Sequence, residues 1–77
     1  MTQNYTGPFR KVLDSYGVSI VRSDRPGDGS MEFVVSKLPG DVFAAATDYL
    51  TGIGFTNVIR GFDMTTELPK LVGRLPR

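Results

Sequence analysis

The stretch from Ser30 to Phe62 constrains the fold most, because it holds three consecutive elements whose signals agree. A run of apolar and β-branched residues over 30–36 predicts a strand, and a broad apolar stripe over 42–50 predicts an amphipathic helix. A glycine ends that helix, and residues 56–62 predict a second strand. The stretch therefore predicts a β-α-β crossover, which is a packing unit rather than a chemical one.

The end of the central helix is the best-defined local feature of the sequence. If Gly54 is the left-handed residue that follows the helix, Leu50 and Phe55 occupy the two positions that form the hydrophobic contact of a Schellman motif. The glycines around this junction are therefore interpreted as a helix stop and not as a phosphate-binding loop. A helix C-terminus also repels anions.

Two shorter elements precede this stretch. Apolar residues at helical spacing predict a two-turn helix that Gly17 ends: Phe9, Val12, Leu13 and Tyr16. Residues 18–23 alternate as in a half-buried strand, and residues 24–30 are rich in turn formers. We therefore expect the first two strands to form a hairpin with a long loop.

These elements predict an α+β fold in two layers, with the order α-β-β-α-β in a domain over residues 1–64. A three-stranded, mostly antiparallel sheet packs against the helices and comprises Val18–Ser23, Met31–Lys37 and Phe55–Phe62. The right-handed crossover rule places the third strand either beside the second, in parallel, or beside the first, antiparallel. We favour the place beside the first, because the hairpin and the crossover then give a fully antiparallel sheet. The expected core is Phe9, Val12, Leu13, Tyr16, Val18, Ile20, Phe33, Val35, Val42, Phe43, Ala46, Leu50, Phe55, Val58 and Ile59.

Residues 65–77 differ in kind, because no apolar period continues there. Two prolines and Gly73 argue against a helix and predict an extended, Pro-containing C-terminal tail. The tail is too apolar for a solvated end, so its leucines either dock on a partner or cover the protein's own sheet. As docking residues we expect Leu68, Lys70, Leu71, Val72, Arg74, Leu75 and Arg77.

The absence of cysteine and histidine from these 77 residues removes disulfides, structural zinc sites and the commonest catalytic groups. A chain of this length has a small core, so a protein partner or homo-oligomer becomes an expected source of extra stability. Asp24, Asp28 and Glu32 lack the ligand spacing of a calcium loop and are interpreted as hairpin residues. We expect no enzyme, no metal and no cofactor.

The leading hypothesis is a non-catalytic protein-interaction or assembly module, such as an accessory or structural subunit of a viral or bacterial complex. A free sheet edge provides a second contact site by strand addition. The alternative is a small nucleic-acid-binding module, less favoured at a net charge of +1, that uses the basic tail with Arg10, Lys11, Arg22, Arg25 and Arg60. No apolar run is long enough to span a membrane, so the expected location is the cytoplasm or an intracellularly assembled particle.

Overall fold

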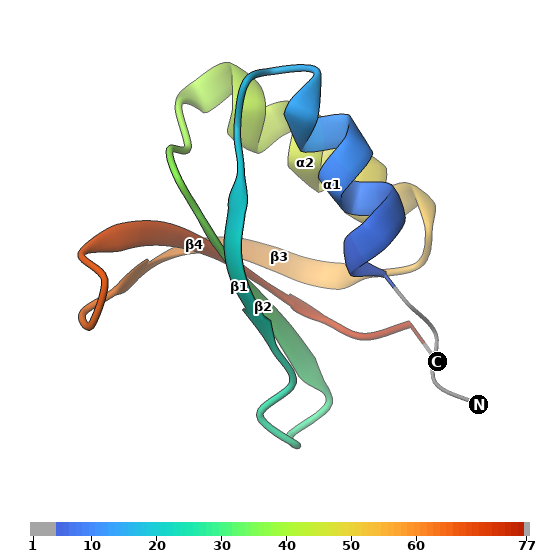
Figure 1. Cartoon of the computed structure of the whole chain (residues 1–77). Helices are drawn as coiled ribbons and strands as arrows, with labels where there is room; N and C mark the ends of the chain where they lie inside the picture. Colours follow the sequence, from blue (N-terminus) through green and yellow to red (C-terminus); the bar gives the residue numbers. More distant parts are fainter. Residues whose placement is uncertain (1–4, 77) are drawn as a thin grey trace.

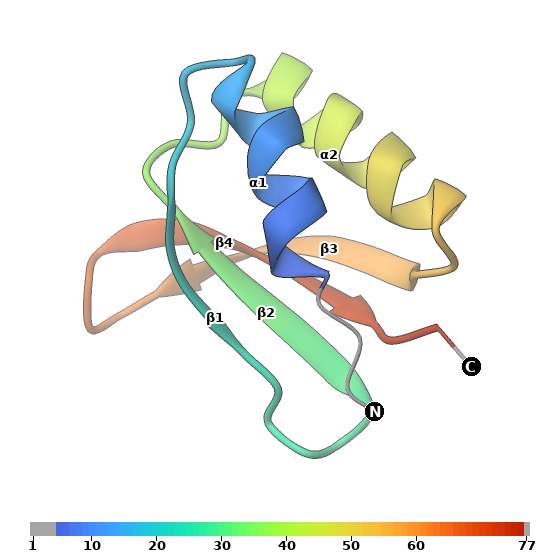
Figure 2. The ribbon, with the colours of Figure 1, turned by 45° about the vertical axis from the view of Figure 1, so that its right-hand side comes forward.

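The computed structural model, which describes residues 5–76, is an α+β fold of two helices and one four-stranded antiparallel sheet (Figure 1). The sheet order is β1-β2-β4-β3. Both helices lie side by side over one face of the sheet, and no helix of the described residues covers the other face (Figure 2). The elements are α1 (Thr6–Asp14), β1 (Ile20–Asp24), β2 (Ser30–Val35), α2 (Gly40–Gly52), β3 (Thr56–Asp63) and β4 (Leu68–Arg74).

The core lies between the helices and the inner face of the sheet. Alternate residues of β2 enter it, and Phe33 meets Phe9 of α1 edge-on with ring centroids 4.8 Å apart. Phe9 also stacks on Tyr49 of α2 at 5.7 Å, so one ring joins all three elements. The buried cluster is Phe9, Leu13, Val18, Met31, Phe33, Val35, Leu38, Val42, Ala46, Leu50, Phe55 and Leu71.

The expected helix stop is confirmed. Gly54 has a φ of +107°, its N–H donates to the carbonyl of Thr51 at 3.1 Å, and the Phe55 N–H donates to the carbonyl of Leu50 at 2.9 Å. These are the two hydrogen bonds of a Schellman motif, and both Leu50 and Phe55 are buried. The helix α1 ends in the same way at Gly17, which has a φ of +71°.

The sequence prediction of three strands followed by an extended tail is not confirmed, because Leu68–Arg74 forms strand β4 inside the sheet. β4 pairs with β2 on one side and with β3 on the other. Leu71 is fully buried, and Gly73 lies where an added Cβ would be 3.1 Å from the ring of Phe55. Leu71 therefore completes the protein's own fold, as one of the two alternatives for the leucines predicts.

A proline is compatible with this inner strand because of where the ladders end. The ladder between β2 and β4 stops at the pair Val34–Lys70, whereas the ladder between β3 and β4 continues to Asp63–Leu68. Pro69 therefore lies just beyond the last pair with β2, where its missing N–H leaves no ladder bond unmade. The β3–β4 hairpin projects past the helices at this end (Figures 1 and 2).

Two further expectations are corrected. β3 pairs with β4 and not with β1, so β1 and β3 form the opposite edges of the sheet. Of the expected core residues, Tyr16 is 43% exposed and Ile59 is 59% exposed. Ile59 pairs with Val72, next to the inward-facing Leu71, so strand alternation places it on the outer face.

Candidate functional site

The edge strand β3 carries the largest exposed apolar side chains of the sheet. Ile59 is 59% exposed, Phe62 is 55% exposed, and Met64 in the following turn is 82% exposed. The register places Phe62 on the helix side of the sheet, like Arg60 opposite the buried Leu71, whereas Ile59 lies on the outer face. Exposed apolar side chains gathered on one edge are typical of a surface that contacts another protein.

The register fixes which backbone groups of β3 point away from the sheet. The Leu75 N–H donates to the carbonyl of Gly29 at 2.8 Å, so the odd-numbered residues of β4 direct their N–H and C=O groups to the β2 side. The even-numbered residues of β4 form hydrogen bonds with β3, and one of them, Lys70, lies directly opposite Gly61. Alternation then directs the N–H and C=O groups of Arg60 and Phe62 outward, to the free edge.

The other edge strand, β1, is protected in ways that β3 is not. β1 has only five residues and a register shift between Ile20 and Arg22. Short length and irregular register both oppose the addition of another strand. β3 has its irregularity at its start, near Asn57, which leaves the ladder from Ile59 to Asp63 regular.

The turn after β3 is held by the carboxylate of Asp63. Its Oδ2 accepts hydrogen bonds from the backbone N–H of Thr66 at 3.0 Å and from the Thr66 hydroxyl at 2.5 Å. Its Oδ1 lies 3.2 Å from a guanidinium nitrogen of Arg22. These hydrogen bonds, those from Thr66 first, lower the pKa of Asp63 and outweigh the effect of its burial.

Charges on the outer face of the sheet are largely paired with one another. Lys70 contacts Glu32 at 2.6 Å, and Arg22 contacts Asp24 at 2.8 Å in addition to Asp63. Val34 is buried on this face between its register partners Arg22 and Lys70. The face therefore presents little unbalanced charge to a partner.

The acidic residues of the β1–β2 hairpin do not form a common site. Asp24 contacts Arg22, Glu32 contacts Lys70, and Asp28 accepts hydrogen bonds from the hydroxyl and N–H of Ser30, which lower the pKa of Asp28. Residues 5–76 contain no group of three or more acidic side chains placed to hold a metal ion. No helix within the same residues is long and apolar enough to cross a membrane.

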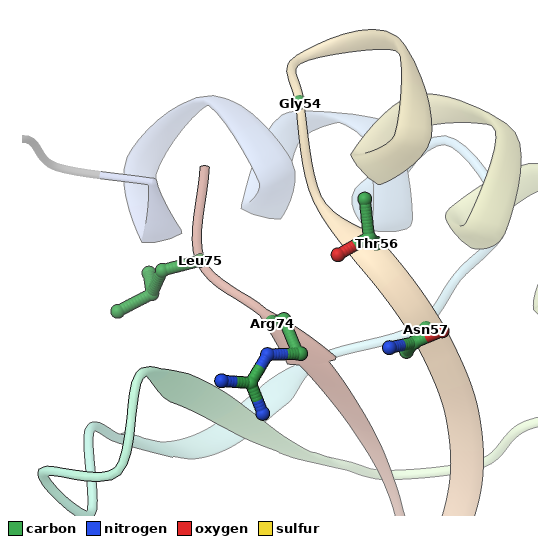
Figure 3. Close-up of a pocket in the computed structure, with 5 residues that line it drawn as sticks. All are labelled: Gly54, Thr56, Asn57, Arg74 and Leu75. Atoms are coloured by element: carbon green, nitrogen blue, oxygen red, sulfur yellow. The ribbon is translucent and has the colours of Figure 1, made fainter. Parts of the chain in front are cut away.

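A shallow depression of about 450 Å³ lies where β3 begins and β4 ends (Figure 3). Its lining residues include one cation, Arg74, and two polar residues, Thr56 and Asn57. Asn57 has a φ of +52°, a left-handed conformation that asparagine tolerates better than most residues. The turn after α2, at Gly54, also borders the depression. The negative end of that helix disfavours an anion here, although the positive charge of Arg74 favours one.

The structure disperses the residues that the sequence suggested for docking. Leu71 is in the core and Lys70 is engaged with Glu32, whereas Arg74 and Leu75 border the depression. Leu68 and Val72 are half-buried on the outer face, and Arg77 lies outside the described residues. Their role in binding a partner stays a prediction.

The cations of the nucleic-acid alternative are also separated. Arg10 and Lys11 are exposed on α1, on the helix side, whereas Arg22 lies on the opposite face of the sheet. The Arg25 guanidinium lies 5.3 Å from the ring centre of Tyr5, and Arg60 donates to the carbonyl of Leu38 at 2.7 Å and lies over the ring of Phe43. These five residues form no single basic patch.

Sequence reasoning missed the exposed residues of the β3 edge. Ile59 was expected in the core, and neither Phe62 nor Met64 was expected at a binding surface. An apolar residue in a strand gives the same sequence pattern whether it is buried on a sheet face or exposed at a sheet edge. Only the order of the strands shows which of the two applies. Comparison with known proteins found no matching family model, no matching curated protein and no matching solved structure.

Proposed function

We propose that the protein is a non-catalytic assembly module that contacts another polypeptide through the free edge of β3. The observation that carries this proposal is the combination of outward backbone groups at Arg60 and Phe62 with exposed apolar side chains on the same strand. Backbone groups provide affinity in strand addition, and alternate side chains provide specificity. The protected state of the β1 edge supports β3 as the contact edge.

The charges of the described residues support binding of a polypeptide rather than binding of a nucleic acid. Single-stranded nucleic acid binds where cations line a groove beside exposed aromatic rings. On the outer face, Arg22 and Lys70 are neutralised by acidic partners instead. The exposed ring of Phe62 is accompanied by Arg60, whose guanidinium is engaged with Leu38.

A photo-crosslinking experiment tests this function. The photoreactive residue benzoylphenylalanine replaces Phe62 in one variant and Tyr16 in a control, because Tyr16 is also an exposed aromatic but lies after α1. Irradiation in the cells that produce the protein should yield a crosslinked species from the Phe62 variant and none from the Tyr16 variant. Equal crosslinking from both positions, or none from position 62, would refute the proposal.

A further inference from the structure

We infer that the polypeptide added at β3 is a second copy of this chain, joined by antiparallel pairing of the two β3 strands about a two-fold axis at Gly61. This inference rests on the proposed function and specifies its partner. A symmetric pair requires a self-complementary surface, in which residue i meets residue j and residue j meets residue i. The β3 edge meets this requirement in one register.

The backbone limits the choice of register. Only Arg60 and Phe62 direct N–H and C=O groups outward within the regular ladder from Ile59 to Asp63. With the axis at Gly61, Arg60 faces Phe62 of the other copy and Phe62 faces Arg60, so both outward residues of both chains form hydrogen-bonded pairs. An axis at Phe62 would instead place Arg60 opposite Met64, which lies in the turn.

The side chains favour the same register. An axis at Arg60 would place two arginines directly opposite each other, which is destabilising in a sheet. With the axis at Gly61, each guanidinium faces an aromatic ring, and Arg60 already lies 5.0 Å from the ring centre of Phe43, so a second ring would extend this arrangement. The two exposed Phe62 rings, one from each copy, would both lose contact with water.

The outer face also tolerates this arrangement. The Lys70 side chain lies over Gly61, where an added Cβ would be 3.1 Å from it, so the two Lys70 side chains approach the axis. Each is neutralised by Glu32 at 2.6 Å, which limits their repulsion. The whole chain carries a net charge of only +1, so two copies repel each other weakly.

The expected product is an eight-stranded sheet with helices on one face of each half, held by a short interface. An interface of two short strands is small, and small interfaces are typical of weak, reversible association. The dimer should therefore form over the micromolar to millimolar concentration range and should leave the fold of each copy unchanged.

Sedimentation velocity of the full chain across that range tests the inference. The wild-type protein should shift from monomer to dimer as concentration rises. Phe62→Lys should raise the dissociation constant by about tenfold or more, because the introduced ammonium faces Arg60 of the other copy. Val21→Lys is the matched control, since Val21 is 51% exposed on the opposite edge strand, and this variant should dimerise as the wild type does.

Circular dichroism melting of each variant confirms that the fold is retained. A wild-type protein that stays monomeric at all concentrations would overturn the inference, and so would equal weakening by the two lysine substitutions. A monomeric protein that still crosslinks through position 62 to a different polypeptide would refute the second copy as partner and leave the proposed function standing.

Discussion

At the scale of single residues, the glycines show how closely the core restricts side chains. Gly73 faces the core, and a Cβ there would lie 3.1 Å from the Phe55 ring and 3.3 Å from a methyl group of Val58. Phe55 is itself buried and cannot move away freely. Gly52, in the last turn of α2, has nothing within 4 Å of the same position.

We therefore expect opposite effects from one substitution at these two glycines. Gly73→Ala should lower the free energy of unfolding by about 1–3 kcal/mol, because it overpacks the core. Gly52→Ala should raise it by about 0.5–1 kcal/mol, because alanine loses less backbone entropy in a helix. Urea denaturation of both variants measures the difference, and destabilisation by Gly52→Ala or stabilisation by Gly73→Ala would contradict this packing.

At the scale of elements, the β3–β4 hairpin depends on the ionised carboxylate of Asp63. The hydrogen bonds from Thr66 and Arg22 lower the pKa of Asp63 in the folded protein. A depressed pKa in the folded state contributes stability above the unfolded value of about 3.9, and this contribution is lost as the pH falls through the folded pKa.

The free energy of unfolding should consequently decrease between about pH 5 and pH 2 in the wild-type protein. Asp63→Asn should make this decrease shallower, because the neutral amide has no ionisation to lose, and should lower stability at neutral pH. Asp48→Asn, on the exposed side of α2, is the matched control. Identical pH slopes for the wild type and the Asp63 variant would exclude the proposed role of this carboxylate.

Among the elements, the ends of the helices can be predicted from the sequence, and strand β4 cannot. The helix stops at Gly17 and Gly54 were predictable, because left-handed glycine and its hydrophobic contact are local properties. Strand β4 was not, because its signals are not local. Pro69 suits a strand only because the ladder with β2 stops at Lys70. Gly73 suits its inward-facing position because Phe55 fills the space that a side chain there would need.

The candidate site was harder to predict for a related reason. The sequence suggested that a free sheet edge could bind a partner, but it placed the third strand beside the first. The insertion of β4 between β2 and β3 moves β3 to the far edge and exposes Ile59. Strand order depends on contacts between residues distant in the sequence, which no local pattern records.

At the scale of the whole molecule, the sheet is open in two senses. Within residues 5–76 one face has no helix over it, and the β3 edge has exposed apolar side chains beside backbone groups that point away from the sheet. On the open face, Lys70 is paired with Glu32 and Arg22 with Asp24 and Asp63, so we favour the β3 edge as the contact surface. In the proposed dimer, the second copy supplies the other half of a larger sheet.

Amide hydrogen exchange, followed by NMR at increasing protein concentration, tests this claim most directly. The Leu71 amide, in the inner strand, should be protected at every concentration. The amides of Arg60 and Phe62 should exchange rapidly in dilute solution and become protected as the concentration rises, because they then donate to a second β3 strand. Rapid exchange of Arg60 and Phe62 at all concentrations, or unchanging protection of both, would contradict pairing through this edge.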